Sequence, residues 1–178
     1  MKIYLDSGHG INNSGVYDSG AVGPNGVREE QVNFTICGLI KEYLTTAGVE
    51  VVYNQVESNT QAVNHANASG ADLYIAVHCN SAEDPKAHGT EVWYGGSVAS
   101  LGLATCIQRQ VVETLRTAGR GVKKGNWQVT RDTHMPAVLV EIAFVSNPVE
   151  EKILNTYYQQ VEIARAIARG VTDYIMTL

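Results

Sequence analysis

The sequence contains little charge and no basic cluster. Charged residues occupy only 17% of its 178 positions, the formal net charge is −5, and the longest run of Lys or Arg is Lys123-Lys124. A protein that binds nucleic acid through the phosphates normally presents a basic face. We therefore expect no nucleic-acid partner.

Long apolar stretches are also missing. No segment reaches the roughly 18 apolar residues that a membrane span needs. Residues 1–6 hold only a few apolar positions before an acid, which is too few for the apolar core of a signal peptide. We expect no membrane partner, and we expect synthesis in the cytoplasm without a signal peptide.

Cysteine is scarce as well. The three cysteines, Cys37, Cys79 and Cys106, are an odd number, lie inside apolar segments and show no CxxC spacing. This pattern gives no support to a thiolate metal site, and we expect buried, reduced thiols.

What the chain does contain is enough apolar residues, 44%, to bury a core, and no linker or repeat. We expect residues 1–178 to form one domain. Periodicity and turn residues predict strands at 2–5, 49–53, 73–77, 90–94, 127–130 and 137–144, and helices at 29–47, 60–68, 98–117 and 157–176. The uninterrupted apolar segments LYIAV and AVLVEIAF are typical of strands covered on both faces. They predict an α/β fold with a central, mostly parallel sheet flanked by helices.

Three polar side chains lie where such a sheet binds ligands, at the carboxyl ends of its strands. His9 follows the first strand within four residues, His78 directly follows LYIAV, and Glu141 lies inside the most apolar strand. Glu29 joins them, because its spacing places it on the core-facing stripe of the first helix, whereas Glu30 is rotated off that stripe.

Two imidazoles and one carboxylate, with a fourth position open, are the ligand set of a catalytic zinc. A zinc ion would also explain the long loop at 10–28, because glycine-rich backbone can pass close to a metal and form one wall of a groove. The alternative is that each histidine caps a strand or meets a backbone carbonyl.

Glu141 needs an explanation of its own. A carboxylate within AVLVEIAF is costly to bury unless a cation, a donor or a proton satisfies it. One explanation is a buried ion pair with Arg131 or Arg120. The other is a general base whose pKa is set by burial and by the metal.

Four segments together resemble the successive motifs of the zinc-dependent N-acetylmuramoyl-L-alanine amidases of the amidase-3 family, found in bacterial autolysins and phage endolysins. They are DSGHG, NGVREEQVNF, ADLYIAVHCNSA and TRDTHMPAVLVEIAFVSNPVEE, and they follow one another over nearly the whole chain. The sequence departs from the family at Ala143, where a glycine is common, and at 56–73, where an arginine is common.

The resemblance implies that His9, Glu29 and His78 bind zinc and that Glu141 is the catalytic glutamate of a six-stranded domain. Zn²⁺ lowers the pKa of a bound water toward ~7, which makes it a nucleophile at neutral pH. The implied substrate is peptidoglycan, and the implied bond is the amide between N-acetylmuramic acid and L-alanine of the stem peptide.

Further residues are predicted to act around this site. Asn80, His88 and His134 lie near strand ends and are candidates for contacting substrate or stabilising an oxyanion. Glu91 alternates with Trp93 in TEVWYG, which favours a solvated strand residue.

Three functions are compatible with these features: a peptidoglycan amidase, an inactive wall-binding module with the same fold, and a zinc carboxypeptidase. We expect the first, as the monomeric catalytic domain of a phage or prophage endolysin that acts on the bacterial wall after release. The alternative is the catalytic domain of a chromosomal autolysin. We expect no wall-binding domain within residues 1–178.

Overall fold

The computed structural model describes residues 1–11, 15–55 and 58–178. The main strands are β1 (Lys2–Ser7), β4 (Glu50–Asn54), β5 (Leu73–Asn80), β6 (Thr90–Tyr94), β7 (Gly119–Lys124) and β8 (Ala137–Phe144). The helices are α1 (Glu29–Thr46), α2 (Asn59–Ala68), α3 (Val98–Leu115), α4 (Gln128–Arg131), α5 (Pro148–Leu154) and α6 (Tyr157–Ile175). A separate short pair consists of β2 (Gly10–Ile11) and β3 (Tyr17–Asp18).

The six main strands form one sheet in the order β4-β1-β5-β8-β6-β7. All neighbouring strands pair in parallel except β6 and β8, which are antiparallel. This architecture confirms the predicted α/β class and the mostly parallel, six-stranded sheet.

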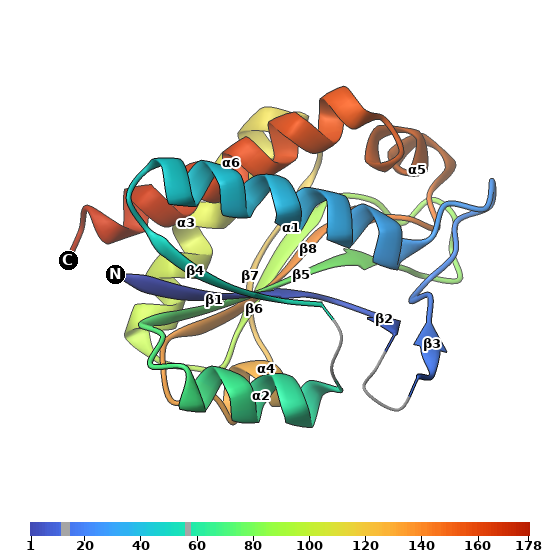
Figure 1. Cartoon of the computed structure of the whole chain (residues 1–178). Coiled ribbons are helices and arrows are strands. Elements are labelled where there is room, and N and C mark those ends of the chain that lie inside the picture. Colours follow the sequence, from blue (N-terminus) through green and yellow to red (C-terminus); the bar gives the residue numbers. More distant parts are fainter. Residues whose placement is uncertain (12–14, 56–57) are drawn as a thin grey trace.

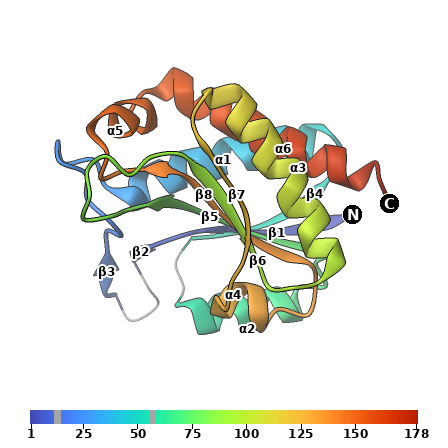
Figure 2. The ribbon, with the colours of Figure 1, turned by 180° about the vertical axis from the view of Figure 1, so that it is seen from behind.

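Helices cover both faces of the sheet, but unequally. The long helices α1, α3 and α6 lie on one face, and the shorter α2 and α4 lie on the other (Figure 1). The view from behind shows α3 and α6 side by side on the first face (Figure 2). Both termini lie at the end of the molecule opposite the β2–β3 pair.

The alternation of strand side chains assigns residues to the two faces. Ile75 and Val77 belong to the large core under α1, α3 and α6, whereas Tyr74 and Ala76 belong to the small core under α2 and α4. With a period of two, the next residue, His78, lies on the α2–α4 face. The short helices leave the carboxyl ends of β5 and β8 uncovered on this face, which is where the polar residues gather.

The structure differs from the prediction in three elements. The segment 127–130, predicted as a strand, instead begins the single-turn helix α4, because the backbone N–H groups of Thr130 and Arg131 donate to the Trp127 carbonyl. Strand β7 was missed, since its sequence GRGVKK has a single apolar residue; it is a sheet edge, where cations are common. Helix α5 was also missed, although Asn147 as N-cap and Pro148 after it are the usual start of a helix.

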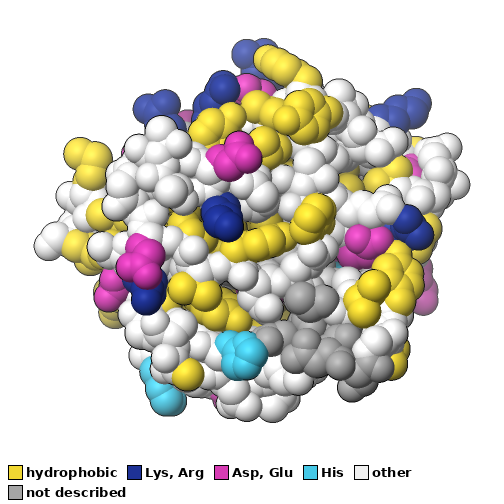
Figure 3. Space-filling view, viewed as in Figure 1, with side chains coloured by type: hydrophobic (Ala, Val, Ile, Leu, Met, Phe, Trp, Pro, Cys, Tyr) yellow, Lys and Arg dark blue, Asp and Glu magenta, His cyan; other side chains and the backbone are white. Residues whose placement is uncertain are grey.

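Charged side chains are dispersed over the face shown in Figure 3. On the described part of the face shown in Figure 3, Lys and Arg side chains are scattered among acidic and neutral ones. None of the described helices has the length and apolar character required to cross a membrane.

Candidate metal centre and active-site cleft

His9 lies just after β1 with a backbone φ of 67°, in the left-handed region that non-glycine residues rarely adopt. Its Nδ1 lies 2.7 Å from Asp18 Oδ2, and pairing of Gly10 with Asp18 in the β2–β3 ladder brings that carboxylate beside the ring. A carboxylate on one imidazole nitrogen leaves the other nitrogen as the ligand atom. This is one reason for the long loop, which supplies the group that orients His9.

Glu29 is the first residue of α1, and it is only 4% exposed. Its Oε1 accepts from the backbone N–H of Cys79 at 3.0 Å, and its Oε2 from that of Ala21 at 2.9 Å. The helix N-terminus also favours a negative charge at this position. Burial opposes ionisation of Glu29, but hydrogen bonds with His78 and His9 outweigh it and hold its pKa well below the ordinary value.

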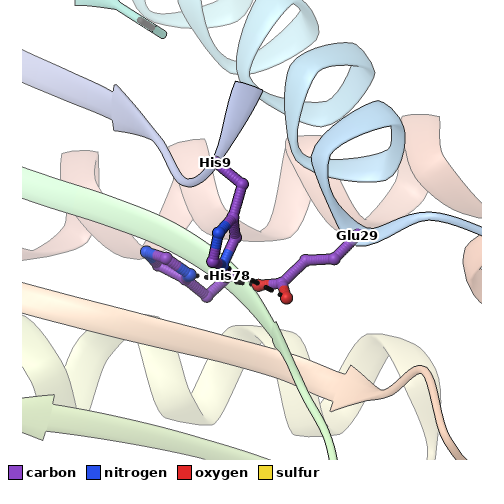
Figure 4. A group of neighbouring side chains, drawn as sticks. All are labelled: His9, Glu29 and His78. Atoms are coloured by element: carbon purple, nitrogen blue, oxygen red, sulfur yellow. Dashed lines mark hydrogen bonds and ion pairs between the residues drawn. The ribbon is translucent and has the colours of Figure 1, made fainter. Parts of the chain in front are cut away.

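His78 extends from β5 toward the same carboxylate. Its Nδ1 lies 3.0 Å from Glu29 Oε1, while His9 Nε2 lies 3.3 Å from Glu29 Oε2 (Figure 4). Burial lowers the pKa values of both imidazoles, but the Glu29 carboxylate outweighs burial, raising that of His9 to about 9 and raising that of His78. Both imidazoles therefore favour the protonated form more than a free histidine does.

These three side chains fit a zinc ion. One potential ligand atom from each lies within 4.8 Å of the others. Two imidazoles and a carboxylate are the donors that Zn²⁺ prefers in catalytic sites, and they leave a coordination position open. Zinc would compete with protons for the ring nitrogens.

Two glycines make room for the cluster. A Cβ at Gly8 would lie 2.2 Å from Cε1 of the His78 ring, and one at Gly20 would lie 2.6 Å from both Glu29 Oε2 and His9 Cδ2. Gly20 also has a φ of +62°. Any side chain at these positions would displace the ligands, which is a second reason for a glycine-rich loop.

The loop is anchored from a distant part of the chain. Glu151 of α5, only 1% exposed, accepts from the backbone N–H groups of Asn25 and Val27 at 2.8 and 3.2 Å. Its other oxygen accepts from Asn25 Nδ2 at 2.6 Å. A buried carboxylate thus fixes the segment that leads into Glu29.

Glu141 lies beside His78, its partner in the register between β8 and β5. Its Oε2 is buried and has no hydrogen-bond partner among the described residues. Burial is the main cause that raises its pKa to about 7; His78 opposes this rise, and Glu29 adds to it. The predicted alternative of an ion pair is wrong, because Arg120 binds Glu91 and Arg131 binds Asp132.

A cleft of about 560 Å³ contains this group, within the usual range for small-molecule sites. Its lining includes His9, Glu29, His78 and Glu141 together with residues of the α2 and α4 segments such as Asn59 and Trp127. The cleft therefore opens at the strand ends that α2 and α4 leave uncovered. Asn80, a candidate for contacting substrate, also lines it.

Glu91 was predicted to be solvated, and this is wrong. It is 4% exposed and lies beside Glu141 in the antiparallel pairing of β6 with β8. The reason is a set of four donors on its carboxylate: Arg120 and Lys123 at 2.6 Å, Asn80 at 3.0 Å and Trp93 at 3.1 Å. Burial raises the pKa of Glu91, but Lys123 and Arg120 outweigh this and lower it. Glu91 thereby fixes the amide of Asn80 in the cleft.

The structure places the other two predicted substrate contacts outside the described lining of the cleft. His88 binds the Lys86 carbonyl through Nδ1 at 2.8 Å and lies in a separate depression near α5. The backbone N–H of His134 donates to Asn67 at 2.8 Å, between α2 and α4. Conversely, sequence reasoning missed Asp18 and Trp127 at the cleft; only the aspartate within the glycine-rich loop could have been suspected.

Comparison with known proteins agrees with this geometry. Residues 3–173 match the amidase-3 family, described as N-acetylmuramoyl-L-alanine amidase. The chain is 33% identical to the uncharacterised protein YqiI of Bacillus subtilis, with 97% of this chain and 84% of that protein covered. It is 32% identical to the N-acetylmuramoyl-L-alanine amidase LytC of the same organism, again over 97% of this chain but only 35% of LytC.

Solved structures of amidases have the same fold as this chain. An N-acetylmuramoyl-L-alanine amidase from Clostridium difficile 630 superposes with a TM-score of 0.91 at 28% identity, over 99% of this chain and 97% of that one. The catalytic domain of CwlV, an N-acetylmuramoyl-L-alanine amidase from Bacillus (Paenibacillus) polymyxa, has a TM-score of 0.90 at 30% identity and 99% coverage of both chains. By its sequence and its fold, this chain belongs to the N-acetylmuramoyl-L-alanine amidase family.

Proposed function

We propose that the chain is a zinc-dependent catalytic domain that hydrolyses the amide between N-acetylmuramic acid and L-alanine in peptidoglycan. The observation that carries this proposal is the placement of Glu141 beside His78, in the same cleft as the His9–Glu29–His78 cluster. Family membership supplies the substrate class, since LytC is itself named an amidase of this bond.

His9, Glu29 and His78 would hold the zinc ion. When bound, Zn²⁺ lowers the pKa of water toward ~7 and polarises a carbonyl group. Asp18 holds His9 in orientation through Nδ1, and the N–H groups of Ala21 and Cys79 hold the Glu29 carboxylate. The protein thus holds two of the three ligands, His9 and Glu29, before substrate arrives.

Glu141 would move the proton. Its buried Oε2 has a pKa raised toward neutrality, so it accepts a proton from the attacking water as the water oxygen bonds to the carbonyl carbon. As the C–N bond breaks, the same carboxyl delivers that proton to the leaving nitrogen. Asn80, fixed by Glu91, offers its amide to the substrate or the developing oxyanion.

A zinc carboxypeptidase fits the cleft less well. That activity needs a positive group for the terminal carboxylate of the substrate. No Lys or Arg occurs among the described residues that line the cleft. Arg120 and Lys123, which lie on the neighbouring strand β7, are bound to Glu91. An inactive wall-binding module would have no need for an unpaired buried carboxylate such as Glu141.

In its biological role, we place the chain as an endolysin domain that acts on the wall after release and works as a monomer. The catalytic domain of the CD27L endolysin is among the similar structures, with a TM-score of 0.84 at 26% identity. A chromosomal autolysin is the alternative, and the similarity to LytH of Staphylococcus epidermidis, named a probable cell wall amidase, is compatible with it. Expression only during phage induction would decide for the endolysin.

Analysis of the products from purified cell walls tests the reaction. The amidase should release new amino-terminal alanine, with intact stem peptides separated from glycan strands. Binding without products would identify a wall-binding module, and released carboxy-terminal residues would identify a carboxypeptidase. The Glu141→Gln variant controls for contaminating hydrolases.

A further inference from the structure

We propose that Trp127 is the floor of a subsite for a saccharide ring of the glycan strand, at the α2–α4 side of the cleft. This inference rests on the proposed function and deepens it, because it states which part of peptidoglycan lies on which side of the cluster. The first observation is that the Trp127 side chain is exposed to solvent. Trp127 is 46% exposed although it lines the cleft, so its ring is not part of the core.

The ring is held in place from behind. Trp93 packs against it edge to face, with centroids 5.8 Å apart and an interplanar angle of 77°. Gly125 lies so close to both rings that a Cβ there would come within 2.7 Å of Trp93 and 2.9 Å of Trp127. Trp93 is in turn fixed by its Nε1–H bond to Glu91 and by Lys123, whose Nζ lies 5.2 Å from the ring centroid. These contacts hold the Trp127 ring in place as the floor of the proposed subsite.

The described residues that line the cleft beside Trp127 are uncharged and mostly polar. They come from the β4–α2 connection and the start of the two short helices: Gln55, Ser58, Asn59, Gln128 and the apolar Val129. Gln128 also bridges the two walls, since its Nε2 donates to Thr60 Oγ1 of α2 at 3.0 Å. Among the described residues, the titratable ones that line the cleft are the cluster, its partner Asp18, Asp6 and Glu141.

An aromatic plane among amides and hydroxyls matches one part of the substrate. A pyranose ring with N-acetyl groups is uncharged, has an apolar face for the indole and has hydroxyl and amide groups for the walls. The stem peptide carries carboxylates, for which this side of the cleft offers no cation among the described residues. Because the scissile amide joins sugar to peptide, placing the sugar over Trp127 directs the peptide to the opposite side of the cluster.

Two soluble substrates with the same scissile amide test the subsite. One is a disaccharide peptide, N-acetylglucosaminyl-N-acetylmuramoyl-peptide, and the other is the matching D-lactoyl peptide without sugar. For Trp127→Ala, the ratio of kcat/KM for the disaccharide peptide to that for the lactoyl peptide should fall about tenfold, mainly through KM. Trp127→Phe should recover most of that ratio.

The control is Tyr157→Ala, because Tyr157 is 65% exposed and lies away from the cleft. It should keep the wild-type ratio. A wild-type ratio in Trp127→Ala would overturn the subsite, and so would an equal fall in Tyr157→Ala. Thermal unfolding of each variant separates loss of fold from loss of binding.

A binding measurement separates this inference from the proposed function. Titration with the N-acetylglucosamine trimer should change the tryptophan fluorescence of the wild-type protein, and Trp127→Ala should abolish the change. If zinc-loaded protein cleaves neither substrate, the proposed function fails, while the trimer titration still decides the subsite. No fluorescence change in the wild type would overturn it.

Discussion

Replacing Gly8 with alanine would place a methyl carbon inside the space of the His78 ring. The new Cβ would lie 2.2, 2.5 and 2.6 Å from ring atoms, so the ring must withdraw by at least 1.2 Å to reach an ordinary contact of 3.4 Å. A zinc site tolerates only about 0.2 Å of error in its ligand distances. We therefore expect Gly8→Ala to weaken zinc binding by ~10² or more, as loss of one ligand would.

Competition against a chromophoric chelator measures the effect. Gly38→Ala is the matched control, because Gly38 lies within α1 and a Cβ there meets nothing within 4 Å. That control should bind zinc like the wild type and gain up to about 1 kcal/mol of stability, since alanine favours a helix more than glycine does. Wild-type zinc affinity in Gly8→Ala would refute the arrangement of His78 described above.

Three further changes test other parts of the account. In the zinc-free protein, Glu141→Gln should raise the free energy of unfolding at pH 8.5 by on the order of 2 kcal/mol, because the folded pKa of Glu141, about 7, exceeds the ordinary 4.5. Urea titrations should show that this difference between variant and wild type disappears as the pH falls toward 4.5. Glu91→Ala leaves Arg120 and Lys123 without their acceptor and frees Asn80, so calorimetry should show that the free energy of unfolding falls by about 2 kcal/mol, and wall digestion should show a lower kcat. A loss of stability with unchanged kcat would contradict the role given to Asn80. Glu151→Ala leaves two backbone N–H groups of the loop unpaired and should weaken zinc binding ~10-fold in the same chelator assay; unchanged affinity would show that the loop needs no anchor.

The sequence predicted the strands that end at the site and the helix that carries Glu29, because long apolar segments and a regular helical stripe determine these elements. Helix α1 begins at Glu29, as expected, and β5 continues through His78 to Asn80. The gathering of His9 and His78 followed from the rule that parallel strands present ligands at their carboxyl ends, and the place of Glu29 followed from the core-facing stripe of the first helix. Their role as zinc ligands stays a prediction.

The surroundings of the site could not be predicted in the same way. Three of the four donors to Glu91 lie 11 to 32 residues away in the sequence, and Glu151 contacts a loop 124 to 126 residues away. Such contacts depend on which strands become neighbours and leave no local pattern. Glu30 shows the same limit: it is buried at 8% exposure because Tyr17 Oη donates to it at 2.6 Å.

Metal analysis of two neighbouring variants tests the central claim most directly. After dialysis against zinc at a concentration that saturates the wild type, elemental analysis should find about one zinc per chain in the wild type and in Glu30→Ala, whose side chain binds Tyr17 outside the cluster. Glu29→Ala, one residue earlier on the same helix, should lose most of its zinc. Full zinc occupancy in Glu29→Ala, or loss in Glu30→Ala with retention in Glu29→Ala, would contradict the site.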